Sequence, residues 1–338
     1  MGKLLEVEDL HVTFQTHGGE VKAVRGVSLA LSEGETLAIV GESGCGKSVT
    51  AKSIMRLVPE HIGKIKSGSI RLKGRELTTL TEQEMRKIRG KEISMIFQDA
   101  MTALNPTITI GEQIMEGIIR HQGISRREAR EQAIEILTLV GIANPESRLK
   151  QYLHQFSGGM RQRIMIAIAL VCKPAILIAD EPTTALDVTI QAQIVDLFKQ
   201  IQKKTGVSII IITHDLGVVA KIADRVSVMY AGKVVESAPV REIFYNPQHP
   251  YTKGLLASMP RLDSDRNMPL TPIPGTPPDL FSPPAGCAFV ARCDWALEVC
   301  RHHQPAASAF DDQHTVACWL QDPRAKTVKY TLRAATGL

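Results

Sequence analysis

The stretch Gly41-Glu42-Ser43-Gly44-Cys45-Gly46-Lys47-Ser48 decides the fold of this 338-residue chain. It fits the pattern G-x-x-x-x-G-K-[ST] and stands between an expected strand (36–40) and an expected helix (47–57). Its glycines let backbone N–H groups turn toward the β- and γ-phosphates of a nucleotide, and the helix N-terminus adds partial positive charge. Lys47 can bridge the phosphates, and the Ser48 hydroxyl can ligate Mg²⁺. A glycine-rich turn without a ligand is the alternative, and the flanking elements argue against it.

Working outward, short β-branched runs alternate with helical stretches from residue 4 to about 238. This alternation predicts an α/β domain with a largely parallel sheet. The strand pattern stops between 111 and 172, where helical periodicity predicts an inserted helical region. The expected strands are 35–40, 92–97, 175–180, 207–213 and 225–230.

Polar side chains follow the ends of several expected strands. Asp180 and Glu181 are adjacent, and successive strand side chains diverge. We therefore expect Asp180 to hold Mg²⁺, through water, and Glu181 to polarise the attacking water as the general base. Gln98 and His214 end two further strands, and the carboxyl ends of parallel strands meet at one edge. Both are therefore expected at the same crevice as Lys47, although each alone would be read as an ordinary polar residue.

A second anion site is expected at Phe156-Ser157-Gly158-Gly159-Met160-Arg161-Gln162-Arg163. Ser157 has the character of a helix N-cap. The two glycines that follow allow a phosphate from another molecule to approach exposed N–H groups at a helix N-terminus. A plain helix cap is the alternative. Leu186-Asp187 follows soon after Glu181 and completes the set of motifs.

Composition excludes several other classes. Forty Lys and Arg against thirty-five Asp and Glu leave a net charge of +5, which is too small and too interspersed to indicate nucleic-acid binding. No apolar run approaches the roughly 18–20 residues of a membrane-spanning helix. The N-terminus lacks the pattern of a signal peptide, so a cytosolic location is expected.

The chain beyond 232 has a different character. Eleven of the eighteen prolines fall in 239–284, so regular elements there should be short. Four of the six cysteines lie in the tail, where cytosolic disulfides are disfavoured and metal ligation is the better interpretation. Zinc, a 4Fe-4S cluster and unligated thiols all remain open. The cysteines are Cys287, Cys293, Cys300 and Cys318, and His302, His303 and His314 are either further zinc ligands or solvated loop residues.

Taken together, the motifs resemble, in order and spacing, the ATP-binding cassette of ABC transporters over about residues 4–240. The resemblance implies a RecA-like α/β core with an antiparallel β edge and a helical subdomain (about 99–172), together forming a domain over 1–240. A small Pro- and Cys-rich extension would occupy 241–338. ATP and Mg²⁺ are the implied cofactors, with Ser48, Gln98 and Asp180 as metal ligands. The implied nucleotide contacts are Phe14, Gly41, Ser43, Gly44, Cys45, Gly46, Lys47, Ser48, Val49, Gln98 and Asp180.

The same resemblance implies head-to-tail pairs of cassettes and assigns the remaining roles. Glu181, His214 and Gln98 would be catalytic, with His214 on the γ-phosphate and Gln98 coupling the site to a transmembrane partner. Phe14 would stack on adenine, or else be an ordinary strand residue of the core. The contacts made to ATP held by the partner would come from Ser157, Gly158, Gly159, Gln162 and Asp187.

The segments 98–114 and 246–252, with the whole extension, resemble the ATP-binding subunits of bacterial oligopeptide and dipeptide permeases. The resemblance implies a peripheral subunit at the cytoplasmic face of the inner membrane that powers peptide import. Its partners would be a second, non-identical cassette, two transmembrane permease subunits docked on the helical region and, indirectly, an extracytoplasmic solute-binding protein. It also implies a 4Fe-4S cluster on the four tail cysteines. Importers of nickel chelates or glutathione, and non-transport ABC ATPases, are the alternatives.

Cys45 lies inside the phosphate loop beside Lys47, a setting expected to lower the pKa of its thiol. The sequence therefore predicts that thiol alkylation inactivates the protein and that ATP protects it.

Overall fold

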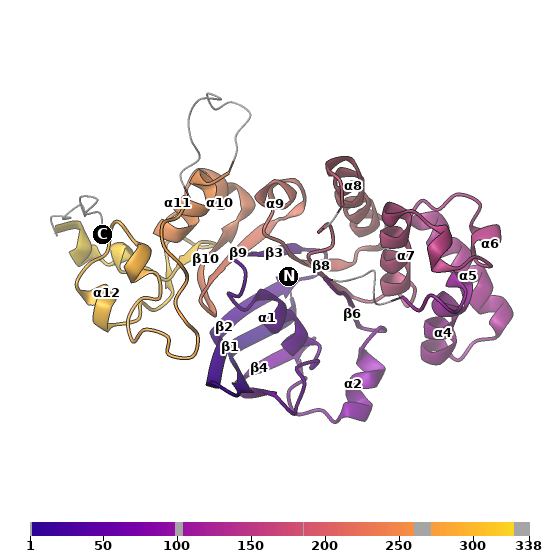
Figure 1. Ribbon diagram of the computed structural model, residues 1–338, viewed down its shortest axis with the longest axis horizontal. Coiled ribbons are helices and arrows are strands. Elements are labelled where there is room, and N and C mark those ends of the chain that lie inside the picture. The colour runs from indigo at the N-terminus through magenta and orange to yellow at the C-terminus, as the bar shows by residue number, and fades with distance from the viewer. Residues whose placement is uncertain (1, 99–103, 185, 260–271, 328–338) are drawn as a thin grey trace.

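The computed structural model describes residues 2–98, 104–184, 186–259 and 272–327, which form two sheets and the helices around them (Figure 1). The larger sheet has the strand order β11-β12-β10-β9-β3-β8-β7-β6. Its centre is parallel, and all five predicted strands are present, with ends within one residue of those expected. They are β3 (Thr36–Val40), β6 (Ile93–Ile96), β7 (Ile176–Asp180), β8 (Ser208–Ile212) and β9 (Arg225–Tyr230).

Both faces of this parallel sheet are buried, which explains its uninterrupted apolar runs. In β8, Ile209 and Ile211 belong to one core, and Ile210 and Ile212 belong to the other. The alternation follows from the period of two along a strand. The sheet therefore separates two apolar cores, and its register is fixed from both sides.

The second sheet is antiparallel, with the order β2-β1-β4-β5, and provides the β edge that the resemblance implied. It packs on the core that also contains α1 and α2, and Leu5, Leu10 and Leu31 are fully buried there. Its strands are β1 (Lys3–Thr16), β2 (Gly19–Ser32), β4 (Gly63–Leu72) and β5 (Arg75–Glu76), and the helices are α1 (Lys47–Ile54) and α2 (Glu82–Ile88).

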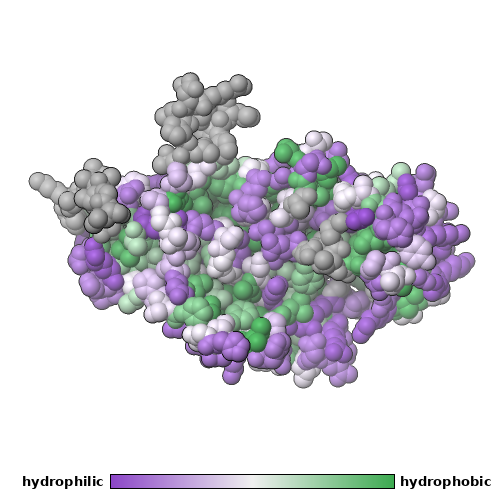
Figure 2. Space-filling view, in the orientation of Figure 1, coloured by the Kyte–Doolittle hydropathy of each residue, from purple (hydrophilic) through white to green (hydrophobic). Residues whose placement is uncertain are grey.

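Between β6 and β7, helices replace strands throughout the described residues 104–175. Capping boxes set two of the helix starts: Thr109 with Glu112, and Ser125 with Glu128. The helices lie together at the right of Figure 1, and their outer surface in Figure 2 is largely hydrophilic, as expected for helices with one buried face. They are α4 (Ile110–Gln122), α5 (Arg126–Leu139), α6 (Pro145–Arg148), the 3₁₀ turn η1 (Leu153–Gln155) and α7 (Gly158–Leu170).

The remaining core helices are α8 (Val188–Thr205) and α9 (Leu216–Ile222). No helix in the described ranges combines the length and apolarity that crossing a bilayer requires. The domain limits 1–240, 99–172 and 241–338 stay a prediction, and residues 99–103 lie outside the described residues.

After β10 (Lys233–Pro239), every described element has eight residues or fewer, which confirms the expectation drawn from the prolines. This part occupies the orange and yellow side of Figure 1. Its elements are α10 (Val240–Tyr245), α11 (Pro250–Ala257), η2 (Val290–Arg292), α12 (Val299–His302), β11 (Ser308–Ala309), β12 (Thr315–Val316), η3 (Trp319–Gln321) and η4 (Pro323–Thr327).

The extension is built into the cassette core. Strand β12 pairs with β10, so the main sheet continues into the tail. The rings of Tyr251 and Phe289 pack on Tyr230 of β9, with centroids 4.5 and 5.2 Å away. All three belong to the larger apolar core. A continuous core of this kind is not evident from the sequence.

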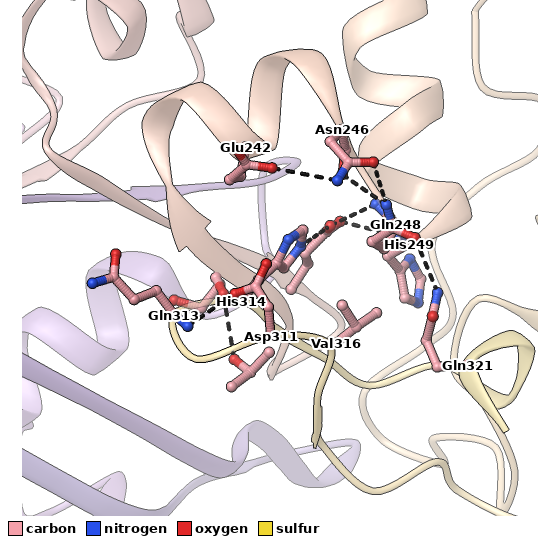
Figure 3. A network of polar contacts seen from close by, with 12 residues as sticks. Glu242, Asn246, Gln248, His249, Asp311, Gln313, His314, Val316 and Gln321 are labelled. Carbon is pink, nitrogen blue, oxygen red and sulfur yellow. Dashed lines mark hydrogen bonds and ion pairs between the residues drawn. The ribbon is translucent and has the colours of Figure 1, made fainter.

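A buried polar network fastens the same region (Figure 3). Glu236 of β10 and His314 are both fully buried, and His314 Nε2 lies 2.7 Å from Glu236 Oε1. The backbone N–H groups of Gln248 and His249 donate to the two carboxylate oxygens, at 2.6 and 3.0 Å. His314 is therefore not a solvated loop residue, and that expectation was wrong. Its Nε2 is taken up by Glu236, so a role as zinc ligand gains no support. Burial lowers the pKa of His249 to about 3, so that ring stays neutral.

We predict that Glu236→Ala lowers the free energy of unfolding by about 3–5 kcal/mol, because it leaves a buried imidazole and two buried N–H groups without their acceptor. Glu236→Gln keeps an amide oxygen and should cost less. Chemical denaturation followed by circular dichroism measures both. Glu298→Ala, an exposed site whose side chain is 78% accessible, is the control and should stay within about 0.5 kcal/mol of wild type. A Glu236→Ala loss no larger than that of the control contradicts the argument.

Candidate functional site

The loop 41–48 joins β3 to α1, as its motif predicts. Gly41, Gly44 and Gly46 have φ values of +149°, +77° and +100°, which favour glycine. A Cβ on Gly41 would lie 2.1 Å from the Met229 carbonyl oxygen, so that position has no room for a side chain. No side chain of the described residues caps the N-terminus of α1, which leaves its N–H groups to face an anion.

Lys47 is buried and lies across the loop. Its Nζ donates hydrogen bonds to the carbonyl oxygens of Gly41 and Glu42, at 2.8 and 2.9 Å. The ammonium thereby stays beside the N–H groups of the loop, where it can meet a phosphate.

Two of the three expected Mg²⁺ ligands, Ser48 and Asp180, meet directly. Ser48 Oγ donates to Asp180 Oδ1 at 2.9 Å, although 132 residues separate them. Asp180 is 1% exposed, and burial raises the pKa of its carboxyl against the opposing effect of the Ser48 hydrogen bond. A nearby cation reverses that penalty. A hydroxyl and a carboxylate are the oxygen donors that Mg²⁺ prefers, so these residues fit the ion.

Three polar groups from different elements surround the Glu181 carboxylate. Gln98 Nε2 donates to Oε2 at 3.1 Å, and His214 Nδ1 lies 3.4 Å from Oε1. Thr184 Oγ1 also donates to Oε2, at 3.0 Å. Thr184 was not among the expected site residues, although its position three residues after Glu181 is a usable signal in the sequence. Glu181 has a φ of +48°, in the left-handed region that few non-glycine residues adopt.

The two glycines of the expected second anion site, Gly158 and Gly159, lie in different surroundings. Ser157 caps α7 by accepting from the Met160 N–H at 3.4 Å. Gly158 is exposed, and a Cβ added there would meet no described atom within 4 Å. A Cβ on Gly159 would lie 2.9 Å from Ile190 Cγ2 of α8, so Gly159 serves helix packing. Asp187 caps α8 in the same way as Ser157 caps α7, accepting from the Ile190 N–H at 2.9 Å.

Gln162 occupies a different setting from the one implied by the resemblance. Its side chain is 6% exposed, and Nε2 donates to the Pro182 carbonyl oxygen at 2.7 Å. This bond joins α7 to the residue after Glu181, so the amide is used within the chain.

The implied adenine contact is half-buried. Phe14 of β1 lies opposite Gly63 of β4, and a Cβ on Gly63 would lie 2.7 Å from the ring. Part of the ring therefore packs on the sheet. Val49 is half-buried in α1.

The expectation for Cys45 was wrong. The residue is 5% exposed, and burial raises the pKa of its thiol more than the charge of Lys47 lowers it. The thiol is therefore neutral and shielded, and the hypothesis of inactivating alkylation loses its basis.

The four tail cysteines lie close enough to affect one another. Burial, with a smaller contribution from the nearby Cys287, Cys293 and Cys300, raises the pKa of Cys318 to about 12. The Cys287 N–H donates to the Cys300 carbonyl oxygen at 2.8 Å. All six cysteines of the chain are free thiols. The described residues contain no group of three or more His, Cys, Asp or Glu placed to hold a metal ion.

Comparison with known proteins adds an independent finding. Residues 24–184 match the family described as ABC transporter, and residues 235–300 match the oligopeptide/dipeptide transporter C-terminal region. The dimeric structure of MJ0796, a bacterial ABC transporter cassette, superposes with a TM-score of 0.63 and 28% identity, covering 70% of this chain and 99% of that one. The predicted cassette fold is thereby confirmed.

The whole-chain relatives are more similar. The chain is 63% identical to the dipeptide transport ATP-binding protein DppD of Bacillus subtilis, covering 96% of this chain and 97% of that protein. It is 57% identical to the oligopeptide transport ATP-binding protein OppD of the same organism, over 97% and 91% of the two chains. These names speak of ATP binding and peptide transport and of no metal, so neither zinc nor a 4Fe-4S cluster gains support from them. The chain belongs to the family of ATP-binding subunits of oligopeptide and dipeptide ABC transporters.

Proposed function

We propose that this chain binds MgATP on the loop 41–48 and hydrolyses it at Glu181 to power peptide import through an ABC transporter. The observation that carries the proposal is the convergence of Lys47, the Ser48–Asp180 pair and the surrounded Glu181 carboxylate at one sheet edge. The similarity to peptide transport ATP-binding proteins supports the transported class. Nickel chelates and glutathione are the weaker alternatives.

The residues divide the chemistry among them. The loop N–H groups and Lys47 hold the phosphates, while Ser48, Asp180 and Gln98 would hold Mg²⁺, which supplies charge neutralisation between the β- and γ-phosphates. Glu181 accepts a proton from the attacking water. The water oxygen bonds to the γ-phosphorus while the bond between that phosphorus and the bridging β-phosphate oxygen breaks. Gln98 and Thr184 donate hydrogen bonds to one carboxylate oxygen, and His214 lies 3.4 Å from the other, where it would also contact the γ-phosphate.

Glu181→Gln removes the base and keeps the hydrogen-bonding shape. We predict that kcat for ATP hydrolysis by the assembled transporter falls by about 10²–10⁴-fold, while the full-length chain still binds ATP in a fluorescence titration. Lys47→Ala should abolish that binding. Glu60→Gln, at an exposed residue, is the matched control. Near-normal turnover by Glu181→Gln would remove Glu181 from its role.

The second part of the proposal concerns the pairing of two cassettes. Ser157 and Gly158 are exposed at the N-terminus of the thirteen-residue α7, and Asp187 is exposed at the start of α8. We propose that these residues and Gly159 complete the ATP site of a second, non-identical cassette. Gln162, buried against Pro182, would act only by holding α7 to the loop after Glu181.

Gly158→Asp tests the pairing, because it adds a carboxylate at an open position facing the expected phosphate. ATP binding by the full-length chain alone should stay within about twofold, whereas ATPase activity of the assembled transporter should fall at least about tenfold through charge repulsion. Gly158→Asn adds a side chain of the same size without the charge at the same position and should retain more of the ATPase activity. Equal activity of both variants would contradict pairing through this helix.

Membership of the family supports a proposal for the rest of the assembly. Peptide ABC transporters of this class work with membrane permease components. We propose that two transmembrane permease subunits dock on the helical region α4–α7, that the chain lies on the cytoplasmic face of the membrane, and that an extracytoplasmic binding protein delivers the peptide.

We further propose that Cys287, Cys293, Cys300 and Cys318 hold a 4Fe-4S cluster, with zinc as the alternative. The support is that four thiols, distant in sequence, lie within electrostatic reach of one another and are all half-buried or buried. Burial raises the pKa of every one of them, so without a cation the thiols stay neutral. The described residues contain no group of three or more such side chains placed to hold a metal ion, so the proposal rests on the proximity and burial of the four thiols.

Anaerobic purification tests the metal. We expect brown protein that contains iron and acid-labile sulfide, with absorbance lost on reduction or acid treatment. Cys293→Ser should lose the iron, and Cys172→Ser, outside the tail, should keep it. Colourless, zinc-loaded protein would contradict the cluster, and metal-free protein would contradict both metals.

A further inference from the structure

The phosphate loop is attached to the C-terminal extension at Glu42. The Tyr251 hydroxyl accepts a hydrogen bond from the Glu42 N–H at 2.9 Å. Tyr251 is fully buried at the start of α11, and burial raises its pKa, so the hydroxyl stays neutral. It belongs to the segment 246–252, which ATP chemistry does not require. The structure thus brings this segment against the second residue of the phosphate loop.

Arg292 holds the side chain of the same residue. Its Nη1 donates to Glu42 Oε2 at 2.8 Å, and its Nη2 donates to Glu42 Oε1 at 3.0 Å, so the contact has two parallel bonds. The Arg292 side chain is 6% exposed and that of Glu42 is 25% exposed. Such a shielded, two-pronged pair fixes direction as well as distance.

The other donors of Arg292 are also engaged. Nε donates to the Pro274 carbonyl oxygen at 2.8 Å, Nη2 to the Ile273 carbonyl oxygen at 3.3 Å, and Nη1 to the Tyr230 hydroxyl at 3.2 Å. The guanidinium is therefore held by the extension and by β9. It approaches Glu42 from a fixed position.

Glu42 is consequently held on three sides. Tyr251 takes its N–H, Arg292 takes its carboxylate, and Lys47 Nζ donates to its carbonyl oxygen at 2.9 Å. The last contact ties the position of the ATP-binding ammonium to a residue that the extension holds. We propose that Arg292 and Tyr251 are positioning residues of the nucleotide site, through which the extension sets the shape of the phosphate loop. This inference rests on the proposed ATP site at that loop.

A role in fastening the extension does not account for the pair. The extension is already attached by the pairing of β12 with β10, by the Glu236–His314 network (Figure 3) and by the packing of Phe289 on Tyr230. A buried ion pair also adds little net stability compared with apolar packing. Unlike those contacts, Arg292 binds a residue of the phosphate loop, Glu42.

The turn that carries Arg292 lies between two tail cysteines. Residues Val290–Arg292 form η2, in which the Val290 N–H donates to the Cys287 carbonyl oxygen at 3.1 Å and the Arg292 N–H donates to that of Phe289 at 3.0 Å. Cys293 follows Arg292 directly. The cysteine-bearing segment thus determines where the guanidinium lies.

Steady-state ATPase kinetics of the assembled transporter test the proposal. We expect Arg292→Gln to raise KM for ATP about tenfold or more and to change kcat far less, because the loop still carries Lys47 but is no longer held in its binding shape. Arg292→Lys keeps the charge but loses the fork, and Tyr251→Phe loses the acceptor for the Glu42 N–H, so both should raise KM by smaller factors. Arg301→Gln is the matched control, since that side chain is 57% exposed in the same extension.

A double variant separates positioning from general damage. With Glu42→Gln and Arg292→Gln combined, KM should be no higher than in Arg292→Gln alone, because both changes remove one contact. Effects that multiply would overturn the proposal. So would a KM within about twofold of wild type in Arg292→Gln together with a lower melting temperature, which is the signature of fastening alone.

Two further variants keep the test decisive. Should Arg292→Gln fail to fold, unchanged KM in both Arg292→Lys and Tyr251→Phe overturns the proposal, and raised KM in both supports it. Lys47→Ala distinguishes failure of the proposed ATP site from failure of the proposed role of the extension. Retained ATP binding by Lys47→Ala refutes the proposed ATP site, whereas loss of binding there with normal KM in the Arg292 variants refutes only the role of the extension.

Discussion

The register of the parallel strands is the constraint on which the site depends. Ile212 of β8 lies beside Ile39 of β3 on one side and beside Asp180 of β7 on the other, and Ala179 lies beside Ile96 of β6. All four strands therefore end at one level. Asp180 is the last residue of β7, and the phosphate loop, Gln98, Glu181 and His214 each begin within two residues after a strand end. Because both faces of these strands are buried, a slip of one residue would move apolar side chains between the two cores and separate the site.

The same constraint explains what the sequence could predict. Runs of β-branched residues located the five parallel strands, and the rule that ligands gather at their carboxyl ends then grouped residues as distant as Gln98, Glu181 and His214. Contacts that side chains make only in the folded chain could not be predicted from the sequence. The hydrogen bond from Gln162 to the Pro182 carbonyl oxygen, for example, has no pattern in the sequence. The predicted direction of the Cys45 pKa shift was wrong because the neighbouring charge of Lys47 can be seen in the sequence, whereas the burial of the thiol cannot.

The C-terminal extension shows most clearly what could not be predicted from the sequence. Its prolines correctly predicted short elements, but β12 has two residues and pairs with β10 about 80 positions earlier, which no local periodicity can reveal. Glu236 and His314 have the residue types of a solvated surface and are fully buried. Tyr251 and Phe289 complete the core around Tyr230. The tail therefore appears in the sequence as an appendage and in the structure as part of the cassette core.

The choice of polar contacts at this junction bears on function. Apolar side chains of similar size would hold the extension to the cassette at least as strongly as the pairs Glu236–His314 and Arg292–Glu42, because burying charges carries a desolvation penalty. Apolar contacts are non-directional, however, and would leave the Glu42 peptide free to rotate. A forked guanidinium fixes the orientation of a carboxylate, and a phenol oxygen fixes that of an N–H group. Both act on the residue whose carbonyl oxygen receives a hydrogen bond from Lys47. The polar contacts at this junction thus fix the orientation of the Glu42 peptide in the phosphate loop, which apolar packing of the same area could not do.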